Sequence, residues 1–245
     1  MRDDLLYAIE SVNWAESNFP SFEREIHIWV QNNINVRFKD IEANPADYLM
    51  VLEEKEPFPL KFSVEFGAYI NTIRSSLDIL ATSLASRFGI SRPDKMYFPI
   101  AESEGIFLSG QGFKGKEFIN GLSPADRALI ESVKPYKGGN GYLWALHNLD
   151  IVRKHKRLLG IEVIPNKIGI LGIGTMGHFT HISDFVRGHN DTVLGFYSKN
   201  APKPDVSLGV SVSVTETDVL PHIPVGTALR DFASMAKSII NLFDH

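Results

Sequence analysis

The chain has 245 residues, of which 44% are hydrophobic and 22% charged, and its formal net charge is −4. This composition is that of a globular protein and excludes a disordered or low-complexity chain. The absence of cysteine excludes a disulfide scaffold, a thiolate zinc site and a cysteine nucleophile. No apolar run reaches the length of a membrane span and the N-terminus is not of the secretory type. We therefore expect a cytoplasmic protein with no membrane partner.

The charge is unevenly distributed along the chain. Residues 1–66 carry 13 acids against 6 bases, whereas residues 134–167 carry 7 bases against 2 acids. A basic segment in an acidic protein suits an anion such as a phosphate or a nucleic acid. The same segment is also compatible with docking against the protein's own acidic N-terminal region, and the sequence leaves both interpretations open.

The first part of the chain predicts a helix followed by a hairpin. Apolar residues recur at helical spacing over residues 5–18, and Pro20 is expected to interrupt this helix before it continues. The period then falls to two. Apolar residues alternate over residues 34–38, and a second apolar run covers residues 48–52. The turn residues between them, 44–47, predict a β-hairpin.

The middle of the chain predicts a helical core. Apolar residues step by three and four over about residues 62–88, and Gly89 closes this long helix. Residues 101–123 are glycine-rich and predict an irregular surface loop or lid. Ser123 and Pro124 open a helix that runs to about residue 133. A second long helix follows over about residues 142–159.

The last part of the chain predicts strands and a closing helix. Residues 167–173, 192–197 and 206–214 are strand-like, and residues 229–243 form an apolar stripe at helical spacing. That stripe packs inside the chain or forms a homodimer, and periodicity does not distinguish the two.

These elements predict an α+β fold. Its helical core holds the long helices over about residues 62–88 and 142–159. An N-terminal β-hairpin precedes this core, and a C-terminal antiparallel β region closed by a helix follows it. We expect a single domain over residues 1–245, whose three parts are residues 1–60, 61–160 and 161–245.

A glycine-rich segment resembles the start of a dinucleotide-binding domain. Gly172, Gly174 and Gly177 form G-x-G-x-x-G after a strand-like run, as at the start of 6-phosphogluconate or hydroxyisobutyrate dehydrogenases. Only 68 residues follow Gly177, and the next strand has no acid placed for a ribose. A glycine-rich β-hairpin needs no ligand. NAD(P) binding at Gly172–Gly177 is therefore a third hypothesis, and we expect no cofactor.

Two histidines near this segment resemble a zinc site in their spacing only. His178 and His181, with Asp184, offer three suitable donor side chains. On a β-strand, however, residues three apart point to opposite faces. We therefore expect no metal site.

A polar seam between the two long helices is the main functional candidate. On the second helix His147, Asp150, Lys154 and Arg157 share one face, and Asn148 and His155 lie on the adjoining stripe. On the first helix Arg74 and Asp78 form an i,i+4 pair. The spacing predicts that five of these side chains converge in one pocket: Arg74, Asp78, Asp150, Lys154 and His155.

These residue types suit acid–base chemistry on a phosphodiester. An imidazole oriented by Asp78 or Asp150 can carry a proton, while Arg74 or Lys154 holds an anion. The catalytic candidates are thus Arg74, Asp78 and His155, and the binding candidates are His147, Asn148, Asp150, Lys154 and Arg157. The alternative is a non-catalytic module that binds another protein and whose polar seam only fixes the register of the helices.

Several short motifs over residues 62–160 resemble a family of uncharacterised bacterial proteins. NTIRSSLDIL, YFPI, SPADRALIESVKPY and LHNLDIVRKHKRLL stand in the order of the family's H-N-L-R-S-A-L-D-H, F-P-I, Q-P-Y and D-K-H-R. The matched positions are Asn71, Arg74, Asp78, Phe98, Pro99, Pro135, Tyr136, Lys154 and His155.

The family's arginine and histidine are similar in spacing to the Arg-x4-His motif of HEPN ribonucleases. The resemblance implies a HEPN-like helical core that binds RNA or a nucleotide phosphate. In its most specific form it implies that this core cleaves RNA without a metal ion. This chain has Ile79 at the histidine position, and Arg153 where the family usually has Asp. Asp150 is the nearest substitute for that acid, and His155 would have to supply the proton transfer. Whether the protein is an enzyme stays open.

Overall fold

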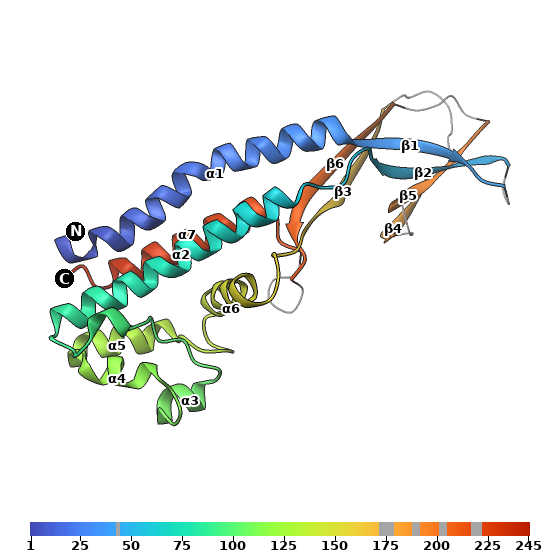
Figure 1. The fold of residues 1–245 in the computed structure, drawn as a ribbon. Coiled ribbons are helices and arrows are strands. Elements are labelled where there is room, and N and C mark those ends of the chain that lie inside the picture. The colour runs from blue at the N-terminus through green and yellow to red at the C-terminus, as the bar shows by residue number, and fades with distance from the viewer. Residues whose placement is uncertain (43–44, 172–178, 188–191, 201–204, 217–221) are drawn as a thin grey trace. The chain divides into compact units, whose positions relative to one another are not determined.

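The computed structural model describes residues 1–245 except 43–44, 172–178, 188–191, 201–204 and 217–221 (Figure 1). The predicted α+β class is confirmed, and the described part of the chain contains no helix long and apolar enough to cross a membrane. The elements follow in the order η1 (Asp3–Leu5), α1 (Leu6–Asn33), β1 (Ile34–Asp40), β2 (Asp47–Glu54), α2 (Leu60–Arg87), η2 (Pro93–Lys95), α3 (Glu104–Ser109), α4 (Gly115–Gly121), α5 (Pro124–Val133), α6 (Gly141–His155), β3 (Ile161–Leu171), β4 (Phe179–Arg187), β5 (Thr192–Ser198), β6 (Asp205–Val214) and α7 (Val225–Asn241).

The chain forms two compact units. The helical unit comprises residues 1–23, 60–161 and 214–245, and the sheet unit comprises residues 24–59 and 162–213. The sequence did not predict this grouping, because it depends on pairing between strands that lie far apart in the chain. A single-domain organisation over residues 1–245 stays a prediction.

Helix α2 is the centre of the helical unit. Its buried positions follow the predicted stripe, and α6, α7 and η2 all contact it. Gly89, with φ of +62°, follows the helix as expected. The apolar stripe of α7 is buried against α2 and α6, so it packs inside the chain. Figure 1 shows α7 running alongside α2.

Helix α1 corrects the prediction that Pro20 interrupts it. The helix runs through Pro20 without a break from Leu6 to Asn33. Phe19 and Phe22 are buried on either side of the proline, and their ring centroids lie 5.3 and 5.5 Å from that of Tyr69 on α2. Pro20 itself is exposed. Packing on both sides of the proline therefore outweighs the hydrogen bond that it cannot donate.

Residues 101–123 also differ from the expected irregular loop, because they form the short helices α3 and α4. The Ser103 hydroxyl accepts from the backbone N–H of Ile106 and so caps α3, and Gly110 ends it at φ +71°. Phe107 and Phe118 anchor the two helices in the core. Helices this short carry too few apolar residues to show a period.

The sheet unit confirms the hairpin and the C-terminal β region. One sheet has the strand order β1-β2-β5-β4 with antiparallel pairs, and β3 pairs with β6. Its core centres on Met50, Leu52, Leu194 and Tyr197. Strand β4 occupies the place where a dinucleotide-binding fold requires a helix. The Gly172–Gly177 motif and His178 lie outside the described residues, as do the side chains of His181 and Asp184.

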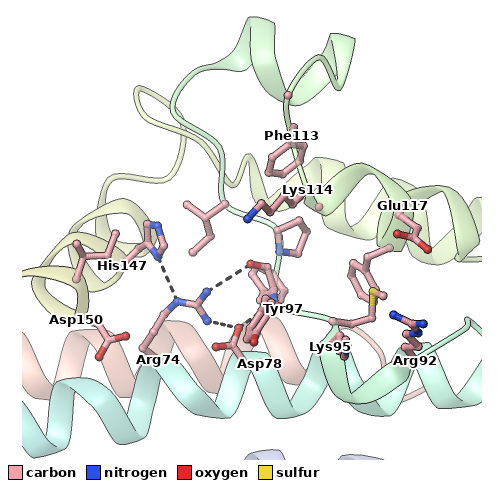
Figure 2. Close-up of a pocket in the computed structure, with 18 of the residues that line it drawn as sticks. Arg74, Asp78, Arg92, Lys95, Tyr97, Phe113, Lys114, Glu117, His147 and Asp150 are labelled. Atoms are coloured by element: carbon pink, nitrogen blue, oxygen red, sulfur yellow. Dashed lines mark hydrogen bonds and ion pairs between the residues drawn. The ribbon is translucent and has the colours of Figure 1, made fainter. Parts of the chain in front are cut away.

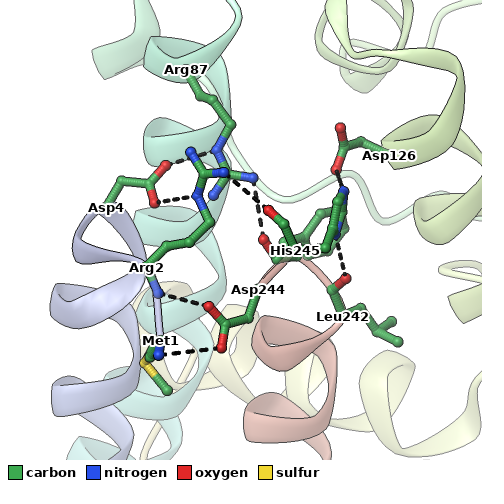
Figure 3. Close-up of polar contacts among 9 residues, drawn as sticks. Met1, Arg2, Asp4, Arg87, Asp126, Leu242, Asp244 and His245 are labelled. Atoms are coloured by element: carbon green, nitrogen blue, oxygen red, sulfur yellow. Dashed lines mark hydrogen bonds and ion pairs between the residues drawn. The ribbon is translucent and has the colours of Figure 1, made fainter.

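The ends of the chain meet in a polar cluster of the helical unit (Figure 3). Arg87 Nε lies 2.7 Å from Asp4, and the Arg2 amide donates to Asp244 over 2.6 Å. The Arg87 side chain lowers the pKa of Asp4 below its ordinary value, although burial opposes the shift. His245 Nε2 lies 3.4 Å from the buried Asp126. The cluster ties the start of α1 to the ends of α2 and α7.

We predict that Phe22→Ala lowers the free energy of unfolding by about 3–5 kcal/mol, the cost of a large cavity in a packed core. Tyr7→Ala, at a side chain that is 78% exposed on the same helix, should change it by less than about 0.5 kcal/mol. Urea unfolding followed by circular dichroism measures both. Equal effects of the two substitutions would show that α1 does not pack on α2 beyond Pro20.

Candidate functional site

The helical unit contains a pocket of about 1020 Å³. Its wall is built by four segments: the second half of α2, residues 91–100 around η2, residues 112–118 at the start of α4, and α6. Figure 2 shows α2 along the bottom of the pocket, with side chains of the other segments gathered around Arg74 and Asp78.

The structure brings the five side chains of the predicted seam to this one pocket. Arg74 and Asp78 lie on its wall together with Asp150, Lys154 and His155, and His147 joins them. The α6 positions are spaced by three and four residues, so they share the helix face that lies towards the pocket. This placement follows the predicted geometry, while the roles of the residues stay predictions.

The Arg74 side chain is buried in the pocket wall and is held in place by hydrogen bonds. Its side chain is only 6% exposed, and Nη1 donates to Asp78 Oδ1 over 2.6 Å. Its Nη2 donates to the Phe98 carbonyl over 3.4 Å, while the Phe98 amide donates to the same Asp78 oxygen over 2.9 Å. These hydrogen bonds form a closed ring that joins α2 to residues 97–100, the YFPI segment. Arg74 therefore cannot swing without breaking several hydrogen bonds.

His147 contacts this arginine. Arg74 Nε donates to His147 Nδ1 over 3.5 Å. Burial and the charge of Arg74 lower the pKa of His147 from 6.5 to about 4, although Asp150 opposes the shift. The imidazole is thus neutral near pH 7. An arginine contacts this imidazole, while the expectation that Asp78 or Asp150 orients an imidazole stays a prediction.

Asp150 instead joins the two helices. It is buried, and its Oδ1 accepts from the side-chain amide of Asn71 on α2 over 3.1 Å. Its Oδ2 lies 2.6 Å from Lys154 Nζ, and Arg153 Nε lies 3.6 Å from Oδ1. Asn71 is one of the positions that resemble the bacterial family but was not among the predicted site residues. Its partner lies 79 residues further along the chain, and no local pattern predicts that contact.

Two predicted binding residues are not brought to the pocket. The Asn148 amide donates to the Trp144 carbonyl over 2.9 Å, one turn back on its own helix. Helix α6 ends at His155, earlier than predicted, and Arg157 forms a bidentate pair with Glu216 at 2.6 and 2.8 Å. Burial raises the pKa of Glu216, but hydrogen bonds from Arg157 and the Gly160 amide lower it overall.

The sequence missed three cations on the pocket wall. Arg92, Lys95 and Lys114 line the pocket, are exposed, and form no ion pair with any residue that the structure describes. A Cβ added to Gly115 would lie 2.7 Å from the Pro99 side chain. This close approach holds the start of α4 against the YFPI segment and brings Lys114 to the pocket. Little in the sequence signals the three cations, because residues 92–114 carry three acids as well as these three bases and so show no excess of positive charge.

The wall carries five cationic side chains against three carboxylates. Two of the carboxylates, Asp78 and Asp150, already pair with Arg74 and Lys154. The remaining cations therefore give the pocket a positive field. Among the described residues no group of His, Asp and Glu side chains could hold a metal ion.

No family model matches the chain, and neither a curated protein nor a solved structure matches it. The resemblance to HEPN-like proteins therefore stays a prediction. The function has to be argued from the pocket itself.

We predict that His147 makes the protein less stable as the pH falls. The unfolded chain binds a proton on this histidine near pH 6.5, whereas the folded state binds it only near 4. The contribution of His147 to the free energy of unfolding is thus fully present above about pH 6.5 and is lost as the pH falls from 6.5 to about 4. Between about pH 7 and about pH 4.5, urea unfolding should show a larger loss for the wild type than for His147→Gln, which has no titrating group. Parallel losses would contradict a depressed pKa.

Proposed function

We propose that the pocket binds the phosphate of a nucleotide, carried by a free nucleotide or by single-stranded RNA. The observation that supports this most directly is the set of three exposed cations, Arg92, Lys95 and Lys114, around a fixed arginine. Lysine offers a phosphate a mobile point charge, and arginine offers a planar fork of donors. A phosphate would take the place of the carboxylate partners that these three side chains lack among the described residues.

An aromatic wall beside these cations supports a nucleotide over an inorganic anion. The Tyr97 ring is 66% exposed on the pocket wall, next to Phe98, whose backbone is held by Asp78 and Arg74. Phe113 lies on the other side of the pocket, next to Lys114 (Figure 2). Aromatic rings next to cations accommodate the base and the phosphate of one nucleotide.

The geometry supports binding better than cleavage. General base catalysis needs a free imidazole nitrogen within reach of the attacking hydroxyl. The Nδ1 atom of His147 already accepts from Arg74, and its pKa of about 4 leaves it a weak base. His155 is the other imidazole on the wall, and it is exposed at the last residue of α6. A ribonuclease function would therefore rest on His155.

We predict that Lys95→Ala and Lys114→Ala each weaken nucleotide binding by about threefold to tenfold, the effect of losing one charged contact. Isothermal titration with ADP and fluorescence anisotropy with a short single-stranded RNA test the two carriers of the phosphate separately. Each substitution should also make the affinity for RNA less dependent on salt concentration, by the amount expected for the loss of about one phosphate contact.

The matched control is Lys137→Ala, because Lys137 is an exposed lysine of the helical unit outside the pocket. It should leave both affinities unchanged. Binding that all three substitutions weaken equally would be non-specific attraction to a charged surface. Absence of binding to both ligands would refute the proposal.

We further predict that the purified protein leaves mixed cellular RNA intact at neutral pH, since Nδ1 of His147 already accepts from Arg74 and no described side chain orients His155. Gel analysis after prolonged incubation measures this, with His155→Ala and Lys137→Ala as parallel samples. Cleavage that is lost in His155→Ala but kept in Lys137→Ala would contradict binding alone and would establish a nuclease.

A further inference from the structure

The hydrogen-bonding state of His147 follows from its partner. An arginine guanidinium only donates hydrogen bonds and stays protonated in proteins. The His147 Nδ1 atom that accepts from Arg74 Nε must therefore carry a lone pair. In a neutral imidazole the proton is then on Nε2, which becomes a donor.

This tautomer is set by a donor that has little freedom to move. The other two nitrogens of the Arg74 guanidinium are held by Asp78 and by the Phe98 carbonyl. The Trp144 ring lies beside the imidazole, with 6.0 Å between ring centroids. Both contacts restrict the imidazole to one orientation.

The second nitrogen is open to the pocket. His147 lines the pocket, and no described residue hydrogen-bonds its Nε2 atom. Nε2 is also not one of the buried side-chain atoms without a partner. It is therefore accessible, and its N–H is available to a ligand.

The surroundings of the imidazole keep this donor uncharged. Arg74 and Asp78 face it from α2, and Asp150 and Lys154 lie on its own helix. Burial, Arg74 and Lys154 together outweigh Asp150 and hold the pKa of His147 at about 4. A neutral donor has no charge with which to attract a phosphate, so it suits an uncharged acceptor such as a base carbonyl, a ring nitrogen or a ribose oxygen.

Two of the three exposed cations lie elsewhere on the wall. Figure 2 shows His147 at one side of Arg74, and Lys95 and Arg92 beyond Asp78 on the other side. We infer that the pocket recognises a nucleotide by two chemically different ends. The cations Arg92, Lys95 and Lys114 take the phosphate, and His147 Nε2–H donates to an uncharged acceptor of the nucleoside.

This inference rests on the proposed function and adds a specificity-determining residue to it. A site that presents a hydrogen-bond donor discriminates against ligands that cover this donor and leave it unpaired. His147 therefore selects nucleotides over phosphate compounds that have no nucleoside.

The test compares ADP with inorganic pyrophosphate, which shares the phosphate chemistry but has no nucleoside. Isothermal titration gives the affinity of both ligands for the wild type, His147→Leu, His147→Gln and Lys95→Ala. We expect His147→Leu to weaken ADP binding by about tenfold and pyrophosphate binding much less, since the hydrogen bond from Nε2 to the nucleoside is lost. His147→Gln should keep most of the ADP affinity, because its amide has an acceptor for Arg74 and a donor for the ligand.

Lys95→Ala should weaken both ligands alike, which separates the two ends. Equal losses for ADP and pyrophosphate in His147→Leu, or no loss for either, would overturn the inference and leave phosphate binding intact. No binding of either ligand to the wild type would overturn both proposals.

A second measurement needs no ligand and no substitution. The ¹⁵N chemical shifts of the imidazole distinguish a protonated Nε2 from a protonated Nδ1. We expect the neutral Nε2–H form of His147 from about pH 5.5 to about pH 8. An Nδ1–H form, or an imidazolium within this range, would overturn the inference.

Discussion

The buried charge of Arg74 is the constraint on which the site depends. A guanidinium that is 6% exposed is stable only if hydrogen-bond acceptors surround it. Asp78, one turn along α2, supplies the compensating charge, but the remaining donors need acceptors from outside that helix. The Phe98 carbonyl and His147 Nδ1 provide them. Compensation of one charge thus draws the YFPI segment and α6 against α2, and the pocket lies where the three meet.

Asp150 is the reciprocal contact, a buried carboxylate of α6 that is satisfied from α2. Asn71 reaches it across the interface, while Lys154 neutralises it from its own helix. The hydrogen bonds that His147 and Asp150 accept across this interface are both donated by α2, and together they fix the register of the two helices as well as the pocket wall. The interpretation of the seam as a packing device and its interpretation as a binding site describe the same residues. Only a bound ligand distinguishes them, because the side chains of Arg92, Lys95 and Lys114 form no hydrogen bond or ion pair with the seam.

The sequence predicted the parts of the site that lie on long helices. Periodicity along each helix placed Arg74 and Asp78 on one face of α2 and His147 and Asp150 on one face of α6. Periodicity did not predict the structure where a contact with one residue far along the chain determines it. Arg157 leaves the seam for Glu216, and α1 continues through Pro20 because Phe22 packs on Tyr69. The helices α3 and α4 are too short to show a period, so the sequence predicts an irregular loop where the structure builds part of the pocket wall.

The charge of the pocket does not come from the segment that predicted it. Within residues 134–167, Arg153 and Lys154 face Asp150, and Arg157 is held by Glu216, so three of the seven bases have a carboxylate partner inside the chain. Residues 92–114 show no such excess in the sequence because their cations are spaced among acids and glycines. In the folded chain the pocket cations of this segment keep no carboxylate partner among the described residues, whereas Lys154, the pocket lysine of the basic segment, pairs with Asp150. A charge count along a sequence therefore indicates a site only after the pairs formed by folding have been subtracted.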